Sequence, residues 1–358
     1  MQDVDTLMQQ AVSERVFPGG VLLVSKEGTV AFHKAYGMAD MVSCRRMRTD
    51  TLFDLASLTK PLATALAIMM LIKQNKLDLE QRLDAVLPAF AGDDKASIKV
   101  KHLLYHNSGL PDYRAYYKKV AHVPAQKRKN ELRRLLVKEP RIYPIGEKVE
   151  YSDLGFMILE WMIEHLSAMR LDQFVSEKVY GPLGLENLFF IDLYAPRTKG
   201  LFAATEHCPW RNKLLVGEVH DENAYVSGGI QCHAGLFGSA TAVHTLLMTL
   251  LATYNLETSN TFFSTDLVRL FFRRLPDTDK ALGFDVPAVQ NSSSGNFFSA
   301  NSVGHLGFTG TSFWMDLDRS TIVVLLTNRV HPNRDNNAIK FFRPKLHDAI
   351  MKKLLGIN

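Results

Sequence analysis

The sequence predicts a mixed α/β protein in which one β-sheet is built from both ends of the chain. Near the N-terminus, strand patterns at residues 21–25 and 29–33 flank a short Lys-Glu-Gly segment, which is typical of a β-hairpin. Strand patterns return near the C-terminus, at residues 312–316 and 321–327. Because the region between them is mostly helical in pattern, we expect a helical insertion over one edge of the sheet.

The predicted helices follow from apolar residues that recur every three or four positions. In the middle region they are residues 60–74, 79–87, 99–105, 127–137, 155–167 and 171–180. Residues 4–12 predict a helix that ends at Pro18-Gly19-Gly20, and a closing helix is expected near residues 336–355.

The composition excludes several classes of protein. The chain has 358 residues, of which 46% are hydrophobic and 22% charged, so it is neither disordered nor a fibrous repeat nor a disulfide scaffold. It is longer than the roughly 250–300 residues at which a single core stops growing, which predicts two domains. A formal net charge of +5 is too small by itself to indicate a nucleic-acid partner.

Cysteine usage and apolar stretches bear on the compartment. Cys44, Cys208 and Cys232 are odd in number and far apart, which favours a reducing compartment; one disulfide plus a free thiol is the alternative. The longest apolar stretch, residues 62–72, is too short to span a bilayer, and the first residues lack the apolar core of a signal peptide. The sequence as given therefore predicts a cytoplasmic protein without a membrane span, or a periplasmic or exported one if an export signal was removed.

Positive charge is concentrated in residues 114–141. This segment holds ten Lys and Arg residues but only Glu131 and Glu139 as acids, an excess of eight positive charges. A solvated helix face is one interpretation, and a surface that attracts an anionic polymer is the other. No nucleic-acid-binding motif accompanies the segment, so a nucleic-acid partner is not predicted.

The motif Ser57-Leu58-Thr59-Lys60 is the first candidate for chemistry. Spacing i, i+3 places the hydroxyl and the amine on one helix face, close enough to meet. Pro61 is tolerated only in the first turn of a helix, so Ser57 is placed at a helix N-terminus, where free N–H groups favour a developing anion. Lys60 could activate the serine as a base. The alternative is a polar N-cap with a solvated lysine.

Two further motifs follow along the chain. Tyr151-Ser152-Asp153 precedes an apolar helix, and a tyrosine beside a lysine can share its proton as a general acid or base. The segment from His305 to Thr311 contains Gly307 and Gly310 and leads into a strand. Glycine in an edge strand allows close approach of a substrate, and a backbone N–H there, with that of Ser57, could form an oxyanion hole. The alternatives are an N-cap and a simple turn.

The set Ser57-x-x-Lys60, Tyr151-Ser152-Asp153 and His305-x-Gly307 resembles the penicillin-recognising serine hydrolases. The most similar branch holds the class C β-lactamases, the D-alanyl-D-alanine carboxypeptidases and family VIII-type esterases. Segments from residue 18 to about residue 350 share the resemblance. They are residues 103–111 (LLYHNSGLP), 181–185 (GPLGL), 220–224 (HDENA), 233–237 (HAGLF) and 326–329 (LTNR).

The resemblance implies a β-lactamase/transpeptidase-like fold. An antiparallel sheet flanked by helices would form an α/β domain from residues 1–56 and 225–358. A mostly helical domain, residues 57–224, would be inserted into it, with the active site at the interface.

The resemblance also implies residue roles and a serine hydrolase activity. Ser57 would be the acylated nucleophile, and Lys60 and Tyr151 its proton-transfer partners. The N–H groups of Ser57 and Phe308 would hold the oxyanion. The substrate-binding residues would be Asp153, His305, Gly307 and Phe308, with His305 near a substrate carboxylate. No metal ion or organic cofactor is implied.

Two positions depart from the family pattern. Asp153 stands where the family has Asn, and its carboxylate could pair with Lys60 and keep the amine charged. His305 stands where many members have Lys, and a pKa near 6.5 would weaken binding of an anionic substrate as pH rises through that value. Both departures argue against efficient β-lactam hydrolysis more than against acyl-enzyme chemistry.

The sequence therefore predicts a serine acyl hydrolase that cleaves an amide or ester with a nearby carboxylate. Substrates of this kind are D-amino-acid peptides, muropeptides and β-lactams. A carboxylesterase for small acyl esters is the nearest alternative. A second alternative is a non-catalytic protein that binds penicillin or a cell-wall fragment in the same cleft.

Overall fold

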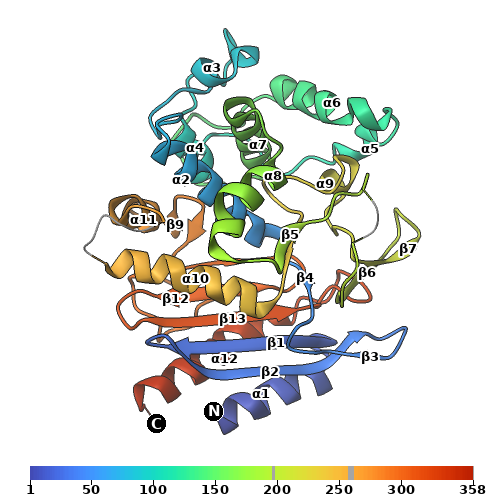
Figure 1. Ribbon diagram of the computed structural model, residues 1–358, viewed down its shortest axis with the longest axis vertical. Coiled ribbons are helices and arrows are strands. Elements are labelled where there is room, and N and C mark those ends of the chain that lie inside the picture. The colour runs from blue at the N-terminus through green and yellow to red at the C-terminus, as the bar shows by residue number, and fades with distance from the viewer. Residues whose placement is uncertain (196–197, 257–261, 358) are drawn as a thin grey trace.

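The structure is a computed structural model that describes residues 1–195, 198–256 and 262–357. Its central element is an eight-stranded sheet in which neighbouring strands run antiparallel (Figure 1). Across the sheet the strands lie in the order β3, β2, β1, β13, β12, β11, β10, β9. Their bounds are β1 Gly19–Lys26, β2 Thr29–Asp40, β3 Arg45–Arg46, β9 Lys280–Ala281, β10 Phe284–Asp285, β11 Ser302–Leu306, β12 Ser312–Asp316 and β13 Thr321–Thr327.

Strands β1 and β13 lie side by side in the middle of the sheet and join the two ends of the chain. Their register runs from Gly20 opposite Thr327 to Lys26 opposite Thr321. The predicted hairpin is present as β1 and β2, both longer than expected, and the two predicted C-terminal strands are β12 and β13. The predicted fold class, an antiparallel sheet flanked by helices, is confirmed.

Both faces of the sheet are buried, which explains the continuous apolar sequence of β1 and β13. On one face, α1 (Gln2–Ser13) and α12 (Ile339–Leu355) cover Leu22 and Leu325. On the other, α10 (Ala240–Asn255) and the helices beyond it cover Leu23 and Val324. Figure 1 shows the remaining helices stacked above this second face.

The helical region begins at the short 3-10 turn that contains Ser57. A π-helical stretch, Lys60–Ala65, continues into α2 (Leu66–Lys73), which runs through the core. The other helices of this region are α3 Leu83–Val86, α4 Val100–Leu104, α5 Tyr117–Val120, α6 Ala125–Lys138, α7 Asp153–Ser167 and α8 Leu171–Val175, which is followed by a second π-helical stretch, Ser176–Tyr180. Short 3-10 turns occupy Ala56–Leu58, Pro88–Phe90 and Gly181–Leu183.

Several elements differ from the sequence prediction. The helix expected at residues 79–87 is reduced to α3, because residues 81 and 82 pair with the backbone near Lys99 instead. Other elements were not predicted. They are helices α5, α9 (Glu222–Val226), α10 and α11 (Thr265–Phe272), the strands β3, β9, β10 and β11, the small sheet β4 (Phe53–Asp54), β8 (Leu236–Gly238) and β5 (Leu188–Phe190), and the hairpin β6 (Ala204–Cys208) and β7 (Lys213–Val216).

Three remaining expectations concern domains, cysteines and membranes. The domain boundaries at residues 56/57 and 224/225 stay a prediction. Cys44, Cys208 and Cys232 all lie in the described chain and none forms a disulfide. One described stretch, Ala56–Lys73, is long and apolar enough to cross a bilayer, but 83% of it is buried inside the protein, as expected of a core helix.

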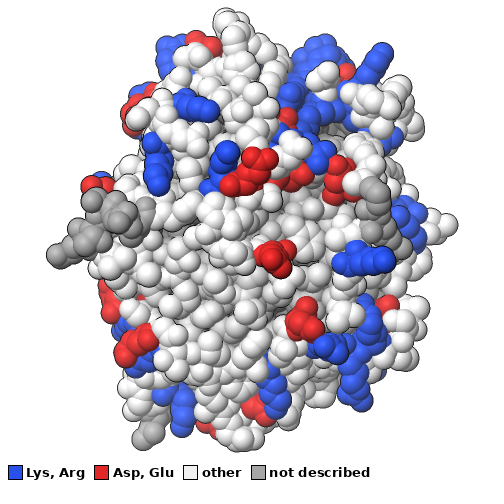
Figure 2. Space-filling model, viewed as in Figure 1, with Lys and Arg blue, Asp and Glu red and all other residues white. Residues whose placement is uncertain are grey.

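The basic segment of residues 114–141 lies on α5, α6 and the adjoining loops. Figure 2 shows Lys and Arg side chains gathered over α6 with acidic side chains beside them. Five of its ten cations form ion pairs with carboxylates: Arg114, Lys129, Arg133, Arg134 and Arg141. Two of these, Lys129 and Arg133, pair with Glu160 and Glu164 on α7. Because of these ion pairs, fewer unpaired positive charges are available to an anionic polymer than the excess of eight in the sequence suggests.

Leu325 in β13 provides a test of the central packing. Its side chain is 0% exposed, so Leu325→Ala should lower the free energy of unfolding by about 2–5 kcal/mol in urea denaturation. Leu201 is 41% exposed, and Leu201→Ala should change the free energy of unfolding by no more than about 0.5 kcal/mol. Equal losses in the two variants would contradict the burial of β13.

Candidate active site

Ser57 lies in a short turn that a buried carboxylate holds in place. The residue before it, Ala56, has φ +48°, a left-handed conformation that costs energy outside glycine. Asp54 is 2% exposed, and its carboxylate accepts the N–H of Ala56 at 2.8 Å and the N–H of His220 at 2.6 Å. These bonds stabilise the strained turn, and Ser57 remains half-buried at its end.

The Lys60 side chain is completely buried directly behind Ser57. Its Nζ lies 3.2 Å from Ser57 Oγ, 2.7 Å from Asp153 Oδ1 and 3.2 Å from the carbonyl oxygen of His233. The ammonium group therefore has three hydrogen-bond acceptors. The predicted contact between Ser57 and Lys60 and the suggested pair of Asp153 and Lys60 are both present.

The groups around Lys60 keep its amine charged. Burial by itself would lower the pKa of the amine, but the charge and hydrogen bond of Asp153, helped by a hydrogen bond with Tyr151, outweigh it and raise the pKa above its usual value. At neutral pH the resting Lys60 is an ammonium ion. It cannot accept the Ser57 proton until it has lost one of its own.

The ring of Tyr151 lies against the Lys60 side chain. The Lys60 Nζ is 4.7 Å from the centre of the Tyr151 ring, which is a cation–π contact. Burial raises the pKa of the Tyr151 hydroxyl, and this outweighs the lowering effect of Lys60 and Ser57. Tyr151 is therefore a neutral phenol at rest, adjacent to both the nucleophile and the amine.

The turn between β11 and β12 brings the second predicted oxyanion donor to Ser57. Thr309 Oγ1 donates to the carbonyl of Asp54 at 2.7 Å, and Thr311 Oγ1 donates to that of Leu55 at 3.0 Å. These bonds attach the turn to the backbone just before Ser57. The N–H of Phe308 has no acceptor among the described residues, so it is available to an oxyanion.

Gly307 allows this close approach. A Cβ on Gly307 would lie 2.0 Å from Thr311 Oγ1 and 2.6 Å from the Leu55 carbonyl oxygen, far inside contact distance. Any side chain at this position would push the turn away from Ser57. The predicted importance of Gly307 thus has a steric cause.

His305 differs from the sequence expectation in two ways. It lies on β11, which is an inner strand between β10 and β12 and not an edge strand. The side chain is 2% exposed, and burial lowers its pKa to about 4, so it is neutral at neutral pH and the expected titration near 6.5 was wrong. Nδ1 donates to the Leu306 carbonyl at 2.9 Å, and Nε2 has no partner among the described residues.

Comparison with known proteins fits this geometry. The family model described as Beta-lactamase matches residues 4–344. The chain belongs to the beta-lactamase family. It is a serine hydrolase of the group that acts on amides and esters.

Two relatives of this beta-lactamase family member cover most of its length. The N-acetylmuramyl-L-alanine amidase of Bacillus subtilis (strain 168) is 34% identical over 92% of this chain and 81% of its own. A relative in Escherichia coli (strain K12) that carries the name D-alanyl-D-alanine carboxypeptidase is 31% identical over 90% of this chain and 82% of its own.

Solved structures share the fold of this family member. EstCE1, a hydrolase with promiscuous acyltransferase activity, superposes with a TM-score of 0.75 at 23% identity and covers 98% of both chains. The octameric penicillin-binding protein homologue from Pyrococcus abyssi has a TM-score of 0.75 at 19% identity, over 100% of this chain and 78% of its own. At these identities the likeness concerns the fold alone.

Two residues beside the active site, Asp221 and His233, were not predicted from the sequence to have a role. Asp221 Oδ1 accepts from His233 Nε2 at 2.9 Å and from the N–H of Ala224 at 2.7 Å, and the His233 carbonyl contacts Lys60. Both belong to segments that resemble the family, and this was the only signal in the sequence.

Within the described part of the chain, Asp153, Asp221 and His233 form a group that could hold a metal ion, because their ligand atoms lie within 4.8 Å of one another. The Lys60 ammonium already neutralises Asp153 in this arrangement. The carboxylate of Asp153 therefore already has a cationic partner within the protein.

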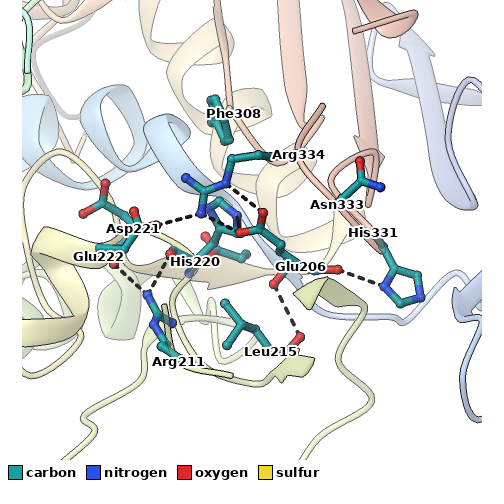
Figure 3. A network of polar contacts seen from close by, with 12 residues as sticks. Glu206, Arg211, Leu215, His220, Asp221, Glu222, Phe308, His331, Asn333 and Arg334 are labelled. Atoms are coloured by element: carbon teal, nitrogen blue, oxygen red, sulfur yellow. Dashed lines mark hydrogen bonds and ion pairs between the residues drawn. The ribbon is translucent and has the colours of Figure 1, made fainter. Parts of the chain in front are cut away.

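A polar network supports the Phe308 side of the site (Figure 3). Arg334 pairs with Glu206 and, at 2.7 Å, with Glu222 at the start of α9, while His220 Nε2 lies 3.1 Å from Glu206. The ring of Phe308 lies 5.6 Å from that of His220. Through these contacts the β6–β7 hairpin and α9 are attached to the turn that carries the oxyanion donor.

Gly307→Ala tests the steric argument. Because the added Cβ must displace the turn, we expect turnover of p-nitrophenyl acetate to fall by roughly 10²-fold, as for a misplaced catalytic group. Gly155 on α7 is the control, since a Cβ there would make ordinary contacts of 3.6 Å or more. Gly155→Ala should retain activity, and full activity of Gly307→Ala would contradict the proposed close approach.

Proposed function

We propose that this chain hydrolyses its substrate through a covalent acyl-enzyme formed on Ser57. The observation that carries the proposal is the 3.2 Å contact between Ser57 Oγ and a fully buried Lys60 amine. Ser57 Oγ attacks the carbonyl carbon, and its proton passes to the Lys60 and Tyr151 pair. The same pair then gives a proton to the departing amine or alcohol, and the acyl group remains on Ser57.

The oxyanion of each tetrahedral intermediate is assigned to the backbone N–H groups of Ser57 and Phe308. The 3-10 turn uses the N–H groups of Leu58 and Thr59 for its own bonds, which leaves that of Ser57 free of them. Water completes the cycle: it loses a proton to the pair as it attacks the acyl carbon, and the pair returns that proton to Ser57 Oγ as the carboxylic acid is released.

The proton content of the pair decides when the reaction can begin. Lys60 is charged and Tyr151 is neutral at rest, so the pair must first lose one proton to solvent. Two groups in such close contact titrate together, and the rate should follow the loss of a proton from the pair. Activity is therefore expected to rise with pH across the neutral range.

The substrate class proposed is an amide in a D-amino-acid peptide or a muropeptide, or a related β-lactam. The names of the two relatives, an amidase of N-acetylmuramyl-L-alanine and a D-alanyl-D-alanine carboxypeptidase, support this class. A substrate carboxylate near His305 would meet an uncharged imidazole, so His305 would not supply a positive charge to it at neutral pH.

A carboxylesterase for small acyl esters is the second candidate. The neutral, buried His305 favours it, since an uncharged ester requires no cation in the position where the family resemblance expects a carboxylate. Phe308, 48% exposed, offers apolar surface to an acyl chain.

Ser57→Ala tests the acyl-enzyme. In intact-protein mass spectrometry with a penicillin or p-nitrophenyl acetate, the natural chain should gain the mass of the acyl group or release product. Ser57→Ala should do neither. Ser13→Ala, which changes an exposed serine, is the control and should behave like the wild-type protein. Equal ester turnover in Ser57→Ala would contradict the proposal, and binding without turnover in the natural chain would favour a non-catalytic binding protein.

Asp153→Asn tests the charge on Lys60. Asp153 raises the pKa of Lys60, so its neutral replacement should lower that pKa and make the unprotonated pair available at lower pH. The acid limb of the profile of kcat/KM against pH should move to lower pH. The control is Asp112→Asn, which removes an exposed carboxylate from the adjacent loop. An acid limb that stays in place in Asp153→Asn would contradict a role of Lys60 in proton transfer.

A further inference from the structure

His106 contacts Tyr151 through its ring. It follows α4 in a left-handed conformation with φ +58°, and its side chain is 3% exposed. The His106 and Tyr151 rings are stacked with centres 4.5 Å apart at an angle of 29°. The His106 ring also stacks on the ring of Phe156 on α7, with centres 5.1 Å apart.

His106 also binds the backbone on both sides of Tyr151. Its Nδ1 accepts the N–H of Ser152 at 3.0 Å, and its carbonyl oxygen accepts the N–H of Glu150 at 2.8 Å. Two further bonds, from Gly146 N–H to the Asn107 carbonyl and from Ile142 N–H to the Gly109 carbonyl, continue this pairing of the two loops. The residues before and after Tyr151 are thus both attached to one histidine.

The imidazole must be neutral to make these contacts, because Nδ1 accepts a hydrogen bond from a backbone N–H. Burial lowers the pKa of His106 well below its usual value, and the positive charge of Lys60 lowers it further. The Tyr151 ring is in contact with the Lys60 ammonium, 4.7 Å away, and with this neutral imidazole.

We propose that His106 is a positioning residue that holds the Tyr151 hydroxyl in place for proton transfer with Ser57 and Lys60. The proposal rests on the function proposed above, in which Tyr151 and Lys60 exchange the proton of Ser57. His106 acts through Tyr151 and is not assigned a contact with the substrate. Its loss should lower kcat and leave KM almost unchanged, because the bound substrate is not affected.

Two substitutions separate the contacts. His106→Phe keeps a ring against Tyr151 but leaves the Ser152 N–H without an acceptor. His106→Asn keeps an acceptor near the position of Nδ1 and tolerates a positive φ, but it loses the stacked ring. With p-nitrophenyl acetate, we expect kcat of folded His106→Phe to fall by about 10–100-fold, the range for a catalytic group displaced by about 1 Å. His106→Asn should retain more of kcat than His106→Phe.

The decisive measurement combines each variant with Tyr151→Phe in a double-mutant cycle. If His106 acts through the Tyr151 hydroxyl, neither substitution should lower kcat further once that hydroxyl is removed. If a His106 substitution lowers kcat by the same factor with and without the Tyr151 hydroxyl, the proposal is overturned. An unchanged kcat in folded His106→Phe would overturn it too. Should His106→Phe not fold, the cycle with His106→Asn decides in the same way. Wild-type activity in the single variant Tyr151→Phe would instead refute the role of Tyr151 in proton transfer, and the His106 proposal with it.

Discussion

The buried ammonium group of Lys60 is the interaction on which the rest of the site depends. An unpaired charge in a protein interior costs several kcal/mol, so the segments that supply its partners must stay close to it. Those partners are Asp153 at the start of α7, the carbonyl of His233 and the hydroxyl of Ser57. One cation thus ties together three segments that are far apart in the sequence. The nucleophile is located by the same contacts that keep the lysine charged.

The remaining parts of the site surround this pair in a consistent way. Asp54 stabilises the strained residue before Ser57, and the backbone of residues 54 and 55 accepts hydroxyl bonds from the turn that carries Phe308. The ring of Tyr151 contacts both Lys60 and His106. Each reactive group is therefore attached to a neighbour that is itself buried, which is the arrangement that proton transfer over short distances requires.

The sequence predicts local features well and long-range ones poorly. The spacing of Ser57 and Lys60 predicts their contact, and the family resemblance is what places Asp153 near Lys60; both contacts are present. The protonation of His305 depends on burial by residues distant in the chain, so its lowered pKa was not predictable. The partial neutralisation of the charge of residues 114–141 was not predictable for the same reason, because the partners Glu160 and Glu164 lie on another helix. The sheet was predicted at β1, β2, β12 and β13, whose apolar patterns are long, and missed at two-residue strands such as β9 and β10.

The charge on Lys60 can be measured directly by NMR titration of its side chain, with the 13Cε or 15Nζ signal assigned by comparison with Lys60→Arg. Asp153 and Tyr151 are expected to keep the amine protonated beyond the usual lysine pKa of about 10.4. The signal should therefore remain that of an ammonium ion through the neutral and mildly alkaline range in which exposed lysines begin to titrate. A Lys60 signal that titrates near neutral pH would contradict the central role of the ion pair with Asp153.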